Sequence, residues 1–163
     1  MAHAVVDDVL FWGAGNEHGF LSQFFVAPFI GADGTRYICC EQYMMAEKAR
    51  AFGDADARAA ILAATKPADM KALGRKVRGF ADGPWDAIKV AVVERGNTLK
   101  FSQHPDLAAA LLATGDAHLA EASPMDAVWG IGTRSRDRSK WRGQNLLGIV
   151  LMSVRTALRL AAS

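Results

Sequence analysis

Prolines and glycines divide most of the chain into segments of helical length, and this punctuation limits what the chain can fold into. Residues 41–52 are largely strong helix formers, and Gly53 follows them as a stop signal. Pro67, Pro84 and Pro105 each stand where a first helical turn would begin, a position that tolerates proline because its missing N–H has no intrahelical partner there. The punctuation therefore predicts a chain built mainly of helices.

The predicted helices contain strong helix formers or apolar residues at helical spacing. They cover residues 41–52, 55–64, 67–77, 84–99, 107–113 and 144–161. The segment Gly31–Gly34 contains an Asp-Gly pair between two apolar runs, which favours a hairpin turn because glycine tolerates positive φ. We expect short strands near 24–30 and 35–39, a candidate strand at 118–122, and irregular chain over 124–143. The expected fold class is mainly α (α+β), with a small N-terminal β-hairpin or sheet.

Size and composition exclude several classes of protein. The 163 residues match the length of one domain, so we expect a single domain over residues 1–163. The net charge of +2 is too small to indicate polyanion binding by itself. The only cysteines, Cys39 and Cys40, are adjacent, which argues against a disulfide framework or a structural zinc site and favours a cytoplasmic setting. Residues 1–8 hold no basic stretch and no apolar run is long enough for a membrane span, so we expect neither a signal peptide nor a membrane.

Glu41 and Lys48 form the first candidate site. They are seven residues apart, which places them within about 20° of each other on a helix, two turns apart. On a partly desolvated face, such a carboxylate can act as a general acid or base, and such an amine as a nucleophile. By spacing alone, a solvated charge pair on a helix surface is the more common outcome.

Two later segments also carry candidate functional residues. Asp126 and Trp129 lie in an irregular stretch with glycines, where an aromatic face can stack on a base; the alternative is a core tryptophan with a turn-capping aspartate. Residues 134–142 hold four arginines and a lysine against one aspartate, which fits either a phosphate-steering lid or a solvated loop. Arg75 is a candidate phosphate contact or an ordinary surface residue.

Read in order along the chain, these motifs resemble one family. Phe20–Phe29 is similar to its LSNFYPSPF opening, and Tyr37–Ala49 to its EHY/EQYMMxxKA helix. Glu121–Gly132 resembles its EASPxDxxWGIG segment, and Trp141–Gly148 falls in the closing part of the pattern. Over about residues 11–158, the chain therefore resembles the NADAR/YbiA-like N-glycosidases.

The resemblance implies a mostly helical, YbiA-like hydrolase that cleaves an N-glycosyl bond at C1 of ribose. Its implied substrate is a phosphoribosylamino-pyrimidine intermediate of riboflavin biosynthesis. Two alternatives are removal of ADP-ribose from guanine bases of nucleic acid and a non-catalytic module that binds NAD or ADP-ribose. We expect a ribosylated nucleotide or ADP-ribosyl substrate, with nucleic acid as a candidate, and no cofactor. No metal is expected either, because the histidines lack metal-ligand spacing.

The resemblance also assigns roles to individual residues. The predicted catalytic residues are Glu41, Lys48 and Asp126. The predicted substrate-binding residues are Trp129, Gly130, Trp85, Phe24, Arg75 and Asn145. Lys48 is expected to attack C1 of an opened ribose, while Glu41 and Asp126 share the stabilising and acid/base roles in an order that stays open. Gln23 and Phe25 depart from the family's asparagine and tyrosine, which leaves the identity of the substrate open.

Overall fold

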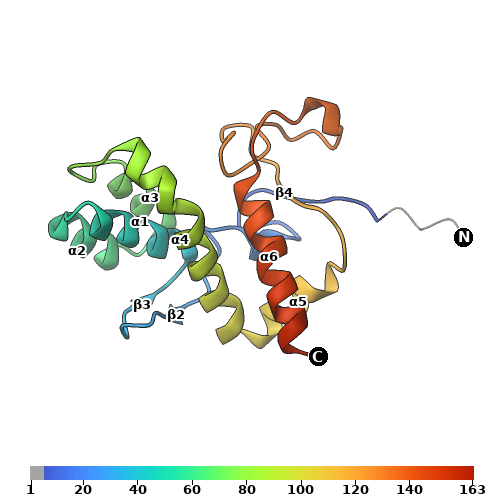
Figure 1. The fold of residues 1–163 in the computed structure, drawn as a ribbon, viewed down its shortest axis with the longest axis horizontal. Coiled ribbons are helices and arrows are strands. Elements are labelled where there is room, and N and C mark those ends of the chain that lie inside the picture. The colour runs from blue at the N-terminus through green and yellow to red at the C-terminus, as the bar shows by residue number, and fades with distance from the viewer. Residues whose placement is uncertain (1–5) are drawn as a thin grey trace, which may run out of the picture. The chain divides into compact units, whose positions relative to one another are not determined.

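The computed structural model describes residues 6–163, and within them the chain forms six α-helices, four short β-strands and two short 3-10 helices (Figure 1). Residues 1–5, part of the stretch for which no signal peptide is expected, lie outside the described residues. The chain divides into two compact units. We call Gln23–His104 the central unit, and the residues up to Ser22 together with Pro105–Ser163 the terminal unit.

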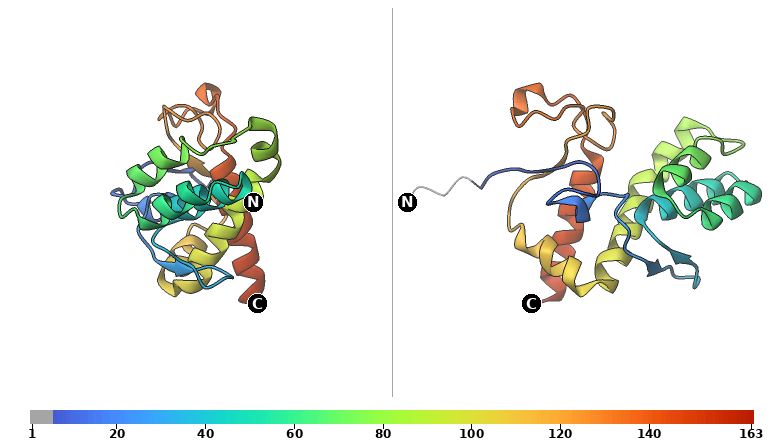
Figure 2. Two further views of the ribbon diagram at one scale, coloured as in Figure 1. Left: turned by 90° about the vertical axis from the view of Figure 1, so that its left-hand side faces the viewer. Right: turned by 180° about the vertical axis from the view of Figure 1, so that it is seen from behind.

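The central unit consists of a β-hairpin followed by four helices. In the hairpin, β2 (Phe29–Ile30) pairs antiparallel with β3 (Arg36–Tyr37), and Gly34 adopts a φ of +85° in the turn between them. The helices are α1 (Cys40–Ala51), α2 (Ala55–Ala63), α3 (Pro67–Gly74) and α4 (Asp82–Gln103). Helix α1 packs against α2, α3 and α4, which lie around it in Figure 2.

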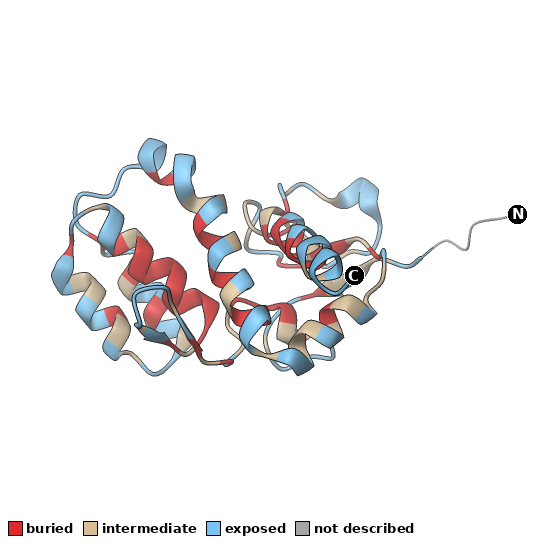
Figure 3. Cartoon of the chain, turned by 60° about the horizontal axis from the view of Figure 1, so that its bottom comes forward, coloured by how far each residue is buried: buried red, intermediate tan, exposed pale blue. Residues whose placement is uncertain are grey.

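Helix α1 is the buried centre of this unit. Nine of its twelve residues are buried, and the helix is red over most of its length in Figure 3. Two glycines let neighbouring helices approach it closely. A Cβ atom at Gly74 would lie 1.9 Å from Sδ of Met45, and one at Gly96 would lie 2.7 Å from Cδ1 of Tyr43. Most polar side chains of α1 are consequently removed from water.

The terminal unit combines a two-stranded parallel sheet with two helices. Its elements are β1 (Val9–Phe11), η1 (Gly19–Leu21), α5 (Pro105–Ala113), β4 (Leu119–Glu121), η2 (Arg138–Lys140) and α6 (Leu146–Ala161). β1 and β4 pair so that Val9 lies opposite Leu119. Helix α6 packs against both α5 and β4. Its contact with β4 requires a glycine, because a Cβ at Gly148 would lie 2.0 Å from the carbonyl oxygen of Leu119.

The predicted mainly α (α+β) class with a small N-terminal hairpin is confirmed. The predicted strand at 118–122 is also present as β4, but its partner β1 was not predicted, because three apolar residues are too few to show alternation. Helix α3 ends at Gly74 rather than Val77, and α4 begins two residues before Pro84. The single domain over residues 1–163 stays a prediction. No helix within residues 6–163 is long and apolar enough to cross a membrane.

Candidate active site

Glu41 and Lys48 lie on one side of α1, and neither is a solvated surface charge. Glu41 is only 4% exposed, and Lys48 is half-buried. The backbone N–H of Glu41, in the first turn of the helix, donates to the carbonyl oxygen of Gln23 at 3.0 Å. Glu41 and Lys48 together form a stripe along α1. Their burial partly removes the carboxylate and the amine from water, as acid/base and nucleophilic roles for these two groups require.

The Lys48 amine lies against an aromatic ring. Its Nζ atom is 4.4 Å from the centroid of Phe80, which makes an edge contact with Phe52 at 5.4 Å between centroids. A cation is attracted to the face of such a ring, while the apolar ring excludes water from one side of the amine. The amine is therefore held in an environment that is only partly aqueous.

The pKa of Lys48 lies below the ordinary value for a lysine, chiefly because burial disfavours the ammonium form. The negative charges of Glu41 and Asp82 oppose this shift, and the positive charge of Arg75 adds to it. A lowered pKa increases the fraction of neutral amine, which is the nucleophilic form. The surroundings of Lys48 thus favour the chemistry expected of it.

Three other predicted residues of the central unit occupy different environments. Arg75 is exposed at the C-cap of α3, and its charge acts on Lys48. Phe24 is half-buried, with Nζ of Lys71 5.8 Å from its ring centroid. Trp85 lies on α4 and is only 8% exposed, so little of its ring is available for stacking on a base. Of these three, Arg75 is electrostatically linked to the Lys48 amine.

Another lysine of this unit, which is fully buried, was not among the predicted site residues. Lys100 on α4 is completely buried, with Nζ 4.9 Å from the ring centroid of Phe101 and 5.4 Å from that of Phe25. Burial lowers its pKa, against the opposing effect of the nearby Cys40 and Cys39 thiols. Its position on the apolar face of α4 was the available signal. Complete burial denies a substrate the access that Lys48 retains.

Gln23, which departs from the family pattern, takes part in a buried polar network. Its Oε1 accepts a hydrogen bond from Nδ2 of Asn97 at 2.8 Å. The Sγ of Cys40 lies 3.7 Å from Oδ1 of the same asparagine, and burial raises the pKa of the Cys40 thiol to about 12. Both cysteines are free and buried. Gln23 therefore contributes to the packing of this unit through its amide.

In the terminal unit, Asp126 caps a turn. Its Oδ1 accepts hydrogen bonds from the backbone N–H groups of Val128 at 2.9 Å and Trp129 at 2.8 Å. This is the geometry of the turn-capping alternative. Trp129 itself is half-buried, so part of its ring faces solvent. These contacts explain the aspartate without requiring a reaction, and its catalytic role stays a prediction.

Backbone hydrogen bonds join the segment around Asp126 to the start of α6. Asn145 donates its N–H to the carbonyl of Gly130 at 3.0 Å, and its side-chain amide bridges to β4, donating to Leu119 O at 2.9 Å and accepting from Glu121 N at 3.1 Å. A Cβ at Gly130 would lie 2.7 Å from the carbonyl oxygen of Glu121. Gly130 and Asn145 thus have clear structural roles, and their substrate contacts stay predictions.

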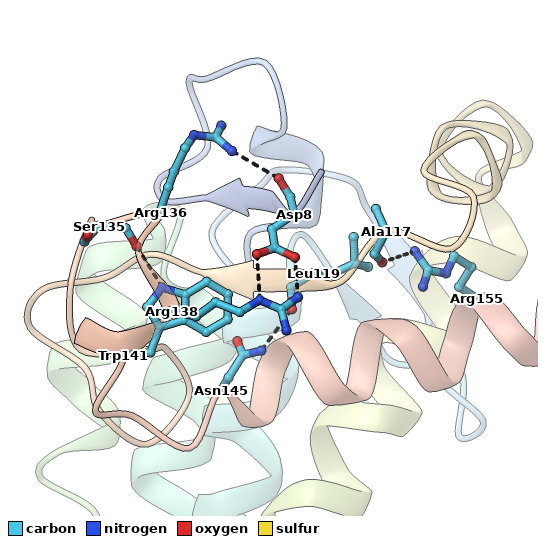
Figure 4. Close-up of polar contacts among 9 residues, drawn as sticks. All are labelled: Asp8, Ala117, Leu119, Ser135, Arg136, Arg138, Trp141, Asn145 and Arg155. Carbon is cyan, nitrogen blue, oxygen red and sulfur yellow. Dashed lines mark hydrogen bonds and ion pairs between the residues drawn. The ribbon is translucent and has the colours of Figure 1, made fainter. Parts of the chain in front are cut away.

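The arginine-rich segment 134–142 is tied to the start of β1 (Figure 4). Arg138 forms a two-pronged pair with Asp8, its Nε donating to Oδ2 at 2.9 Å, and this arginine holds the pKa of the carboxyl below its usual range. The same guanidinium lies 5.3 Å from the ring centroid of Trp141, whose Nε1 donates to the carbonyl of Ser135 at 2.8 Å. Part of the positive charge of segment 134–142 therefore takes part in contacts within the terminal unit.

The structure brings Glu41, Lys48 and Arg75 together within the central unit, and Asp126, Trp129, Gly130 and Asn145 together within the terminal unit. Among residues 6–163, no three His, Cys, Asp or Glu side chains are grouped so that they could hold a metal ion. The chemistry available to the central unit is that of a buried carboxylate and a partly desolvated amine.

Comparison with known proteins identifies the family. The NADAR domain matches residues 10–159. N-glycosidase R617 of Acanthamoeba polyphaga mimivirus is 44% identical, covering 90% of this chain and 94% of that protein. The NMR structure of Escherichia coli YbiA superimposes with a TM-score of 0.81 at 31% identity, covering 97% of this chain and 89% of that one. Riboflavin biosynthesis protein VVA0006 of Vibrio vulnificus is 34% identical, over 93% of this chain but 38% of that protein.

Fold and relatives together define a class, the hydrolases that act on N-glycosyl compounds. Within that class, the chain belongs to the NADAR family. The predicted family and the predicted enzyme class are confirmed. The alternative of a non-catalytic binding module loses its support, because the relatives that match over most of their length are named N-glycosidases.

Proposed function

We propose that this chain hydrolyses the C1 N-glycosidic bond of a phosphoribosylamino-pyrimidine intermediate of riboflavin biosynthesis. The names of R617 and YbiA support the bond type, and the name of VVA0006 supports the pathway. The chemistry rests on one observation: the half-buried Lys48 amine, with its lowered pKa, shares a stripe of α1 with the buried Glu41 carboxylate.

Lys48 is the proposed nucleophile. Opening of the ribose ring leaves C1 doubly bonded to the nitrogen of the substrate, with the ring oxygen released as a hydroxyl. The neutral Lys48 amine adds to C1, and departure of the aminopyrimidine leaves a Schiff base between C1 and Nζ. Water then adds to C1, and the amine leaves as ribose 5-phosphate is released. One water is consumed in total, and Lys48 is regenerated.

Glu41 is the proposed acid/base group and the carboxylate that stabilises positive charge at C1. A carboxylate removed from water interacts more strongly with a developing cation than a solvated one does. Asp126 instead uses Oδ1 to hold the turn before Trp129. We therefore assign the carboxylate chemistry to Glu41. Arg75, exposed beside the Lys48 amine, is the proposed phosphate contact.

A turnover assay with two substrates tests this proposal. The phosphoribosylamino-pyrimidine and an ADP-ribosylated guanine oligonucleotide are supplied side by side at equal concentration, and release of ribose 5-phosphate from the first and of ADP-ribose from the second is measured. We expect the pyrimidine substrate to be hydrolysed with the higher kcat/KM. Lys48→Met should abolish this hydrolysis, whereas the exposed Lys66→Met should retain it. A higher kcat/KM for the oligonucleotide would contradict the proposed substrate.

One observation favours the second candidate function, removal of ADP-ribose from guanine bases of nucleic acid. In the terminal unit, the guanidinium carbon of Arg134 lies 4.2 Å from the ring centroid of Trp12, which is 37% exposed. An exposed aromatic ring beside arginines is suited to stacking a base and holding a backbone. Under this alternative, affinity for single-stranded DNA falls steeply with salt, and Arg134→Met weakens it. Salt-independent or absent DNA binding would remove this candidate.

A further inference from the structure

A pocket lies in the central unit, between the β2–β3 turn, α1 and α4, with a volume of about 360 Å³. Tyr43, Glu47 and Arg50 form its α1 wall. On a helix they fall roughly 110–170° around from the middle of the Glu41–Lys48 stripe. The pocket is therefore on a different face of α1 from the proposed chemistry. Its size lies in the range of roughly 300–1,000 Å³ typical of small-molecule sites.

A carboxylate and two guanidinium groups meet in this pocket. Oε2 of the buried Glu47 accepts a hydrogen bond from Nη2 of Arg50 at 2.7 Å and lies 3.9 Å from Nη2 of Arg95. The two arginine side chains are 62% and 56% exposed, so their remaining N–H groups are accessible. A carboxylate offers about four acceptor positions and a guanidinium five donors. The cluster therefore has unused hydrogen-bond acceptors and donors next to each other.

Aromatic rings form the inner wall. Tyr43 and Tyr37 pack edge to face with 5.0 Å between their centroids, and Nε of Arg95 lies 3.5 Å from the Tyr43 hydroxyl. The ring of Tyr43 lies directly against α4 because position 96 is glycine, where a Cβ would lie 2.7 Å from Cδ1 of Tyr43. Both rings are largely buried, with Tyr43 7% and Tyr37 1% exposed, so the wall offers a ligand only a small aromatic surface, against which a flat ring fits better than a branched aliphatic group.

The charges around this pocket balance, which disfavours strongly anionic ligands. The described lining residues include the carboxylates of Asp33, Glu47 and Glu94 and the guanidinium groups of Arg50 and Arg95. The remaining negative charge is offset by Arg58, whose Nη2 lies 3.8 Å from Oδ2 of Asp33, so no excess of positive charge is left to hold a free phosphate. An uncharged ligand with both a donor and an acceptor suits the cluster, because it can bond to the carboxylate and a guanidinium together.

We propose that this pocket binds an uncharged planar heterocycle with an amide-like edge, in which an N–H lies beside a C=O, as on a nucleobase. The ring packs against Tyr43, the N–H donates to Glu47, and the carbonyl accepts from Arg50 or Arg95. This site is separate from the Glu41–Lys48 stripe, and its existence does not depend on the proposed hydrolysis.

Titration of the isotope-labelled chain by NMR, with inosine as the probe, tests the proposal. Inosine carries the required N–H beside a C=O, whereas 1-methylinosine has the same ring without the N–H. We expect saturable shifts of backbone amides in the β2–β3 turn and near Thr98. We also expect 1-methylinosine to bind at least about tenfold more weakly, because a methyl group replaces the N–H that would donate to the Glu47 carboxylate.

Two variants locate the binding. Thr98→Trp places a large ring in the pocket from the exposed side of α4, and Arg95→Met removes a donor without filling the space; each should weaken inosine binding about tenfold or more. Glu41→Gln, on the other face of α1, should leave this affinity unchanged. The proposal is overturned by an absence of saturable shifts, by equal binding of 1-methylinosine, by binding that survives both pocket variants when they are folded, or by loss of binding in Glu41→Gln.

Discussion

The two regions that contain the predicted catalytic residues use their polar groups differently. In the central unit, Glu41 and Lys48 are carried by regular helix, and the pKa of Lys48 is lowered by burial in that helix's surroundings. In the terminal unit, Asp126 and Asn145 lie on irregular chain, where their side chains satisfy backbone groups. The central unit holds a half-buried amine with a lowered pKa, whereas the terminal unit uses its polar side chains to fix a loop.

This difference distinguishes residues to which the family motifs alone assign the same kind of catalytic role. Asp126 belongs to a motif as distinctive as the one that contains Glu41, yet its contacts account for it structurally. A polar residue can be required in a family because it holds backbone N–H groups of an irregular segment, which regular secondary structure does not satisfy. We therefore expect substitutions in the two regions to have different signatures, loss of turnover in one and loss of stability in the other.

After the complete loss expected of Lys48→Met, the largest effect should be that of Glu41→Gln, which retains the shape of the side chain but removes its charge. Turnover should fall by about 10²–10⁴-fold, the range typical of a lost acid/base group. The matched control is Glu17→Gln, because Glu17 is exposed. Steady-state kinetics on the phosphoribosylamino-pyrimidine measure both. Near-full turnover by Glu41→Gln would show that Glu41 is not an acid/base group.

The sequence predicted helix 41–52 and the alignment of Glu41 with Lys48, because both depend only on local propensity and helical spacing. It did not predict that α1 is buried on most sides, since its many polar residues suggested a solvated face. The structure shows how they are satisfied: Gln42 donates to the carbonyl of Ile61 at 3.0 Å and accepts from the N–H of Ile38 at 2.8 Å. Such partners are distant or in a different element, so spacing cannot reveal them.

The same limit applies in the terminal unit. The candidate strand at 118–122 was predictable from composition, but its parallel partner lies more than a hundred residues earlier in the chain. The capping of the turn by Asp126 was one of two interpretations that local sequence allowed. The burial of Lys100 depends on packing by Phe25 and Phe101 around it, which comes from tertiary structure alone.

A second prediction concerns Asp126 and compares two substitutions at one position. Asp126→Ala leaves the N–H groups of Val128 and Trp129 without their acceptor, which should cost about 1–3 kcal/mol in the free energy of unfolding. Asp126→Asn retains an acceptor oxygen and should preserve most of this stability, with turnover within about tenfold of the unsubstituted chain. Chemical denaturation and kinetics measure the pair. A folded Asp126→Asn chain with turnover reduced more than a hundredfold would return Asp126 to a catalytic role.

Substitutions of the charged residues around Lys48 should have smaller effects on the pH profile, and the direction of each effect depends on the sign of the charge removed. Activity that requires the neutral amine rises with pH through the pKa of Lys48. Arg75→Met removes a positive charge that lowers this pKa, so the rising limb of the kcat/KM profile should move to higher pH. Asp82→Asn removes a negative charge that raises it, so the limb should move to lower pH. Shifts in the same direction, or no shift in either variant, would show that the rising limb does not report the ionisation of Lys48.

Borohydride trapping tests whether Lys48 attacks C1. Borohydride reduces a Schiff base to a stable secondary amine, so turnover in its presence should leave the ribose 5-phosphate residue attached to the protein. Peptide mapping by mass spectrometry then locates the adduct, with Lys66→Met as the matched control. We expect one adduct, on Lys48, that is absent from Lys48→Met. The absence of any adduct during turnover, or an adduct on Lys100 that persists in Lys48→Met, would show that Lys48 is not the nucleophile.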